Sequence, residues 1–124
     1  LAHSRSVSSS IARLHAFIEA WGGYIPEIYG NSVALPAMRD NNQEAAKAWN
    51  DRMQAVRHGC RTFINSIAKD GNLRKDLTEI AALDLFWALL SIKNWEPLLQ
   101  ECRWTQLEYE RMLKRIAETV LVYE

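Results

Sequence analysis

The segment from Ala81 to Ser91 constrains the fold of this chain more than any other stretch. It reads A-A-L-D-L-F-W-A-L-L-S and contains a single charged residue, Asp84. A helical wheel places apolar residues on two opposite sides, with Ile80, Leu83, Phe86, Trp87 and Leu90 on one and Ala81, Leu85, Ala88 and Leu89 on the other. A helix that is apolar all round must be covered on both sides.

Composition favours a helical protein and limits the classes of function. The chain has 124 residues, 48% of them hydrophobic, with only five Gly and three Pro. This composition predicts one all-α domain over residues 1–124, with residues 1–8 expected to be disordered. Fifteen basic and fifteen acidic side chains cancel. The chain therefore lacks the positive field with which a protein holds nucleic acid or an anionic membrane surface.

Two shorter helices are predicted in the first third of the chain. Helical spacing of apolar residues extends from a cap at Ser8 or Ser9 to Trp21, and Gly22-Gly23 is expected to end this helix. A second, short helix is expected over residues 24–29, with a proline in its first turn.

The longest predicted helix occupies the middle of the chain. Capping residues at 40–42 precede apolar residues that recur at three- and four-residue steps from Ala45 to Ile67, and Asp70-Gly71-Asn72 is expected to end the helix. Its other side is polar, as a solvated face should be.

Three more helices are predicted from their first residues. Thr78 is expected to cap the apolar helix, Asn94 a short helix that contains Pro97, and Thr105 the last helix. Thr105 and Glu108 have the spacing of a capping box. The expected architecture is a bundle of about six helices.

The apolar helix and the last helix are together expected to form a dimer interface. Two such helices from each of two chains make a four-helix bundle about a twofold axis, which covers the second apolar side. The predicted interface consists of Ala81, Leu85, Ala88, Leu89, Leu113, Ile116 and Val120. The alternative is that the apolar helix is the central helix of a monomeric bundle.

Three stretches in the second half resemble the C-terminal half of TetR-like transcriptional regulators. They read L-D-L-F-W-A-L-L-S, N-W-E-P-L-L-Q-E-C-R-W-T and L-E-Y-E-R-M-L, within a similarity that extends from about Asp40 to Leu121. The chain departs from the family at Arg103, where a Gly before the Trp is common, and at Pro97, where an ordinary helix former is usual.

The resemblance implies a homodimeric effector-binding domain. The presence of only two cysteines, far apart in the sequence, separately favours a reducing cytoplasm. It implies that operator DNA is bound only through an N-terminal helix-turn-helix domain that this chain does not contain. Within such a domain, a small hydrophobic or aromatic effector is expected in a cavity among the helices. The expected wall of that cavity consists of Trp21, Tyr24, Tyr29, Trp49, Met53, Phe63, Phe86 and Trp87, although any of these side chains can equally fill the core.

Other functions find less support in the residues. His15 and His58 have no second ligand at metal-binding spacing, so no bound metal is expected. The sequence also has no catalytic motif, cofactor loop or membrane-spanning stretch. Neither an enzymatic activity, a cofactor nor an association with a membrane is therefore expected. Asp84 is expected either to serve a ligand or dimer contact or to pair with a nearby Arg, His or hydroxyl. Cys60 and Cys102 are expected to be buried free thiols. The alternative functions are a purely structural helical homodimer and a small helical enzyme with a hydrophobic substrate.

Overall fold

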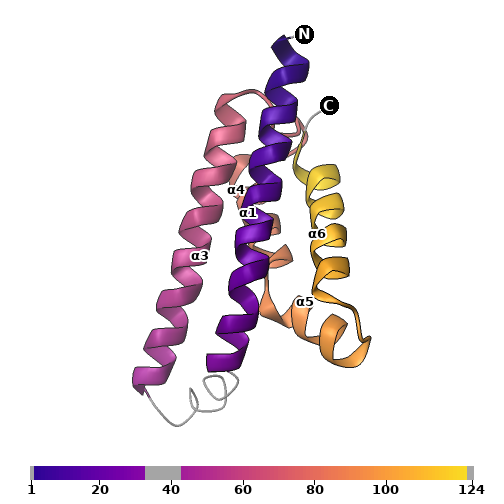
Figure 1. Ribbon diagram of the computed structural model, residues 1–124. Coiled ribbons are helices and arrows are strands. Elements are labelled where there is room, and N and C mark those ends of the chain that lie inside the picture. Colours follow the sequence, from indigo (N-terminus) through magenta and orange to yellow (C-terminus); the bar gives the residue numbers. More distant parts are fainter. Residues whose placement is uncertain (1, 33–42, 123–124) are drawn as a thin grey trace.

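Four helices of eleven residues or more surround a shared core in the computed structural model, which describes residues 2–32 and 43–122 (Figure 1). They are α1 (Ala2–Ser32), α3 (Gln43–Lys69), α4 (Glu79–Leu89) and α6 (Gln106–Leu121), with the short α5 (Ile92–Glu96) and a π-helix, η1 (Pro97–Glu101), between the last two. The all-α class predicted from the sequence is confirmed. The separate helix expected over residues 24–29 is not observed, because these residues belong to α1.

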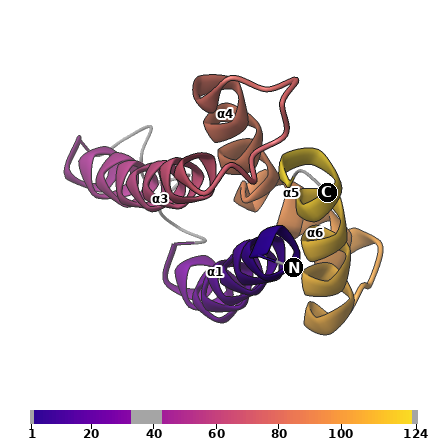
Figure 2. The same cartoon turned by 90° about the horizontal axis from the view of Figure 1, so that it is seen from above.

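The four longer helices are arranged as a ring when the molecule is viewed end-on (Figure 2). In that ring α3 packs against α4, α4 against α6, and α6 against α1. Each helix turns one apolar row inward, and the inner rows are Leu14, Ile18, Trp21 and Ile25 of α1, Cys60, Phe63, Ile64 and Ile67 of α3, Ala82, Leu83 and Phe86 of α4, and Tyr109, Leu113, Ala117 and Leu121 of α6.

Helix α1 continues through Gly22-Gly23, where the sequence predicts its end. Pro26 lacks the N–H that would bond the carbonyl of Gly22, but Nε2 of the Gln106 side chain on α6 donates to that carbonyl at 2.8 Å. Gly22 lies close to α6, since a Cβ there would come within 2.5 Å of the carboxyl group at the end of the flexible Glu110 side chain. The prediction of a break was wrong, and Gln106 of α6 supplies the hydrogen bond that Pro26 cannot donate within the continuous helix.

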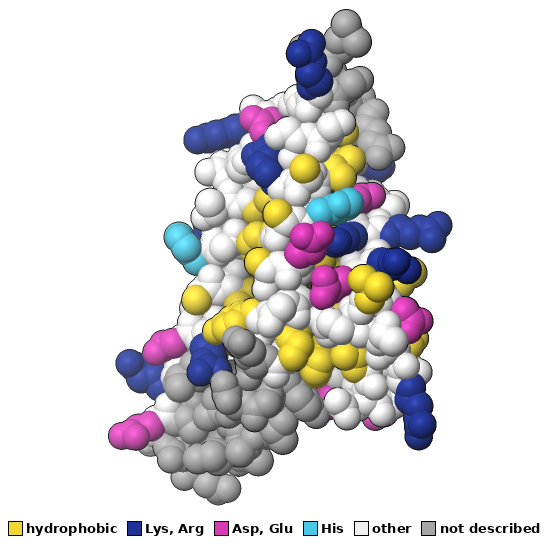
Figure 3. All heavy atoms as spheres, in the orientation of Figure 1, with side chains coloured by type: hydrophobic (Ala, Val, Ile, Leu, Met, Phe, Trp, Pro, Cys, Tyr) yellow, Lys and Arg dark blue, Asp and Glu magenta, His cyan; other side chains and the backbone are white. Residues whose placement is uncertain are grey.

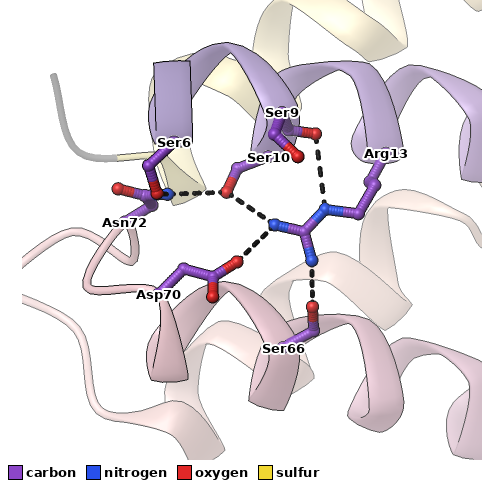
Figure 4. A network of polar contacts seen from close by, with 7 residues as sticks. All are labelled: Ser6, Ser9, Ser10, Arg13, Ser66, Asp70 and Asn72. Atoms are coloured by element: carbon purple, nitrogen blue, oxygen red, sulfur yellow. Dashed lines mark hydrogen bonds and ion pairs between the residues drawn. The ribbon is translucent and has the colours of Figure 1, made fainter. Parts of the chain in front are cut away.

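The first turns of α1 are helical, although residues 1–8 were expected to be disordered. Asn72, which follows α3, is fully buried and donates from Nδ2 to the hydroxyls of Ser6 and Ser10, both at 2.8 Å (Figure 4). Ser10 is itself fully buried. These contacts fasten the N-terminal part of α1 to the end of α3, so the helix begins well before the predicted caps at Ser8 and Ser9.

Arg13 extends the same network from α1 to α3. Its guanidinium donates to Ser10 Oγ at 3.1 Å and to the hydroxyl of Ser66, and it forms an ion pair with Asp70 (Figure 4). Its Nε also donates to the Ser9 carbonyl at 3.3 Å. Arg13 therefore helps to hold the two long helices together.

The capping residues of α4 and α6 are confirmed. The Thr78 hydroxyl accepts from the Ala81 N–H at 3.0 Å, and Thr105 and Glu108 form a reciprocal capping box. The prediction that Asn94 caps the following helix was wrong. Ser91 caps α5 instead, and Asn94 Nδ2 donates back to the Ala88 carbonyl near the end of α4 at 2.7 Å.

Candidate functional site

Two of the eight residues expected to line a ligand cavity lie inside a cluster of three rings. Phe63 and Phe86 are buried, with their centroids 5.5 Å apart, and Phe17 of α1 lies 6.0 Å from the first and 5.2 Å from the second. These tilted contacts are those of core packing. Sequence reasoning missed Phe17, although its position beside the apolar row of α1 was visible.

A second pair of predicted residues lies nearer the end of α1. Trp21 is buried, whereas Tyr24 is 43% exposed, and their rings meet edge to face at 6.2 Å. The Trp21 indole lies beside the buried hydroxyl of Tyr109 on α6. Burial raises the pKa of Tyr109 to about 12, and the neighbouring indole N–H partly offsets that rise.

The remaining predicted ligand residues do not gather around one space. Met53 is half-buried on α3 and packs against the core, and Trp87 is half-buried on α4. The side chains of Tyr29 and Trp49 lie outside the described part of the structure. The eight residues therefore divide between core packing and the edges of helices, as far as they are described.

Asp84 forms an ion pair, which was one of the two alternatives expected for it. Arg57 Nη2 of α3 donates to Asp84 Oδ1 at 2.7 Å, and the same guanidinium lies 5.2 Å from the centroid of the Trp87 ring. The Arg57 guanidinium, which lies over the Trp87 ring and beside the Asp84 carboxylate, therefore links α3 to α4.

A pocket of about 290 Å³ that is open to solvent, called the cavity below, lies between α3 and the beginning of α4. It is lined by Arg61, Ile64, Asn65, Glu79, Ile80 and Leu83, none of which the sequence assigned to a ligand. Ile64 and Leu83 form a buried apolar floor, and Ile80 is 73% exposed. From the sequence, Arg61 and Asn65 were interpreted as part of the solvated face of this helix. The one signal that could have indicated a site is that they lie one turn apart beside an apolar row.

The outer sides of α4 and α6 carry apolar residues that the chain's own described helices leave partly exposed. On α4 the side turned to α3 bears Asp84 and Trp87, and on α6 the side turned to α1 bears Lys114 and Glu118, which contact Glu19 and His15. We call the apolar residues on the other sides of these two packed helices the α4/α6 face. They are Ala81, Leu85, Ala88, Leu89, Met112, Ile116 and Val120, of which Ala81, Leu89 and Val120 are half-buried and Leu89 and Val120 pack against the core.

Exposure on this face is high for large apolar side chains. Leu85 is 43% exposed, Ile116 41% and Met112 37%. Leu113, which was also predicted to lie in a dimer interface, is buried in the chain's own core at 5% exposure, because it belongs to the inner row of α6. The face of the molecule seen in Figure 3 carries charged side chains of both signs, with hydrophobic side chains between them.

Reactive and metal-binding groups are sparse in the part of the chain that is described. Cys60 is buried, and burial raises the pKa of its thiol to about 12, whereas Cys102 is exposed, contrary to the expectation of two buried thiols. Among the described residues no group of three or more His, Cys, Asp or Glu side chains is placed to hold a metal ion. No described helix is both long and apolar enough to span a bilayer.

Comparison with protein-family models, with curated proteins and with solved structures finds no match for this chain. A functional assignment therefore depends on the geometry of the chain's own residues.

Proposed function

We propose that this chain is the effector-sensing and dimerising domain of a TetR-like transcriptional regulator. Two copies associate through the α4/α6 face and form a four-helix bundle about a twofold axis. A small hydrophobic effector binds among the helices of each copy, and its binding shifts the population between two arrangements of the dimer. A separate N-terminal DNA-binding domain converts that shift into altered operator binding.

The exposure of the α4/α6 face is the observation that carries this proposal. Ala81 and Ala88 lie on the side of α4 away from its buried row, and their small side chains allow a partner helix to approach closely. Leu85 and Ile116 provide the larger contacts on either side. Exposed large apolar side chains on two adjacent helices are typical of a protein interface.

The backbone at Arg103 also supports the resemblance. Its φ is 60°, which lies in the left-handed region that glycine adopts most easily. The regulators that the sequence resembles commonly carry Gly at this place before the Trp. The connection before α6 therefore has the conformation for which a Gly is suited, although this chain has Arg there.

Light scattering after gel filtration tests the dimer. We expect a species of twice the 14.3 kDa chain mass, and we expect Leu85→Glu to convert it to a monomer. Two unpaired carboxylates buried at a symmetric contact weaken association by at least about 100-fold. Leu107→Glu is the matched control: Leu107 is 58% exposed and, nine residues from Ile116, lies on the opposite side of α6. A monomeric wild-type chain at micromolar concentration, or equal effects of the two variants, contradicts the proposal.

Ligand screening tests the sensing half separately. We expect aromatic or other hydrophobic compounds to raise the melting temperature of the wild-type chain and of the monomeric Leu85→Glu variant, because the expected cavity lies within one copy. A ligand that binds only the folded state at a hundred times its Kd adds about 2.7 kcal/mol to the free energy of unfolding. If such a screen gives no shift while the dimer is confirmed, the chain is a structural homodimer and not a sensor.

A further inference from the structure

We propose that the cavity between α3 and α4 binds a small zwitterion with an apolar side chain, of the α-amino-acid class. This site differs in place and chemistry from the effector cavity expected among the helices, and it depends neither on dimerisation nor on a DNA-binding domain.

The charged residues that line the cavity do not pair with each other. Helices α3 and α4 run antiparallel, and at one level Arg57 of α3 and Asp84 of α4 form a 2.7 Å ion pair. One turn further along α3, Arg61 lines the cavity together with Glu79 at the beginning of α4. Neither forms an ion pair with another described residue. At this level the two helices therefore present a cation and a carboxylate to the cavity, and no ion pair between described side chains closes it.

A ligand with two opposite charges complements this arrangement. A carboxylate accepts from the planar guanidinium of Arg61, which suits it for two parallel hydrogen bonds. An ammonium group donates to the carboxylate of Glu79. Asn65, one turn beyond Arg61 on α3, offers an amide donor and acceptor at the same wall. A ligand with only one charge leaves one of the two residues without a partner.

The apolar part of the cavity defines the rest of the ligand. Ile64 and Leu83 are 1% and 6% exposed and form the floor, while Ile80 stands 73% exposed at the edge. An apolar side chain laid on this floor also covers Ile80, which removes apolar surface from water. Glycine and other zwitterions without an apolar side chain gain nothing from this contact.

The volume of the cavity suits a small zwitterion. A volume of about 290 Å³ lies at the lower end of the range of ligand pockets, about 300–1,000 Å³. Leucine, isoleucine and valine are small enough to fit within it.

Titration of the ¹⁵N-labelled chain, followed by NMR, tests the proposal with L-leucine, L-isoleucine and L-valine as probes. We expect saturable shifts of the amides of residues 61–65 and 79–83. N-acetyl-L-leucine lacks the ammonium, L-leucine amide lacks the carboxylate, and glycine lacks the side chain, and each should bind about tenfold more weakly or not at all.

Variants of exposed residues supply the decisive comparison. Arg61→Gln and Glu79→Gln should each weaken L-leucine binding about tenfold, while Arg111→Gln on α6 removes a charge far from the cavity and should change nothing. Glu79→Gln should also abolish the preference for L-leucine over its N-acetyl form, because the partner of the ammonium is gone. The proposal is overturned if none of the three amino acids gives saturable shifts up to about 20 mM, if glycine binds as well as leucine, or if Arg61→Gln binds like the wild type.

Discussion

Alanine substitutions at the two adjacent glycines of α1 test how this helix is built. Both positions lie inside Ala2–Ser32, and neither glycine has a positive φ, so alanine fits the backbone at both. Alanine is favoured over glycine in a helix by about 0.5–1 kcal/mol. A Cβ at Gly23 meets no atom within 4 Å. Gly23→Ala should therefore raise the free energy of unfolding by about that amount.

Gly22→Ala should not give this gain. Its Cβ would lie 2.5 Å from Cδ and Oε2 of Glu110, so the carboxylate must turn away and release the hydrogen bond that it accepts from Gln106 Nε2 at 3.2 Å. Losing that bond costs about 0.5–1.5 kcal/mol, which offsets the helical gain. The two variants should differ by about 1 kcal/mol, or about 4 °C in Tm for a chain of this size.

Denaturation followed by far-ultraviolet circular dichroism measures both effects. In the background of Glu110→Ala the contact is removed, so Gly22→Ala should there become as stabilising as Gly23→Ala, with a coupling free energy of about 1 kcal/mol. If the helix instead ended at these glycines in the left-handed conformation, alanine at either position would destabilise by about 1 kcal/mol or more. Destabilisation by both substitutions in the wild-type background would refute a continuous α1.

Four further predictions concern individual side chains. Arg103→Gly should stabilise the chain by about 0.5–1 kcal/mol, measured by urea denaturation, because it relieves a left-handed backbone at a non-glycine residue; a loss of stability would contradict the φ of 60°. Thr105→Ala should cost about 1 kcal/mol through loss of the helix cap. Hydrogen bonds from Thr105 lower the pKa of Glu108. The stabilisation by the Glu108 carboxylate is therefore complete above the ordinary carboxyl pKa and is lost as the pH falls through the lowered value. Glu108→Gln should flatten the acid limb of the pH–stability curve. With a thiol reagent at pH 8, Cys102 should react quickly and Cys60 only on unfolding, since burial raises the Cys60 pKa to about 12; two equally fast thiols would contradict this.

The sequence predicts those helices whose signals are local. Spacing of apolar residues and the capping hydroxyls of Thr78 and Thr105 act within one or two turns, so α3, α4 and α6 are found where they are expected. The course of α1 is not local. Gln106 reaches the Gly22 carbonyl from 84 residues away, and no pattern near Pro26 reveals that this partner exists.

The candidate sites are harder to predict from the sequence. An apolar residue can belong to a cavity wall or to the core, and a charged residue can belong to a binding site or to a solvated surface. Phe63 and Phe86 were equally suited to a cavity wall and to a core, and tertiary packing places both in the core with Phe17. Arg61 and Glu79 looked like ordinary solvated charges. Only the antiparallel packing of α3 on α4 shows that they line one cavity.

The two proposed interactions meet on α4, and this predicts a link between them. The cavity uses Ile80 and Leu83 on the side of α4 near α3, while the partner copy uses Ala81, Leu85 and Ala88 on the other side. Any ligand-induced change in the position of this eleven-residue helix must alter its fit to the partner. Thermodynamic linkage then requires that dimerisation change the affinity for the ligand by the same factor as the ligand changes the dimer Kd.

Leucine titrations at protein concentrations below and above the dimer Kd measure this factor, which we expect to be about fivefold or more. The monomeric Leu85→Glu variant is the reference and should bind with the low-concentration affinity at every protein concentration. If α4 is instead fixed rigidly by the Arg57–Asp84 pair and by its packing on α3, the wild type should show no concentration dependence. Such a result would leave both binding sites in place and remove the coupling between them.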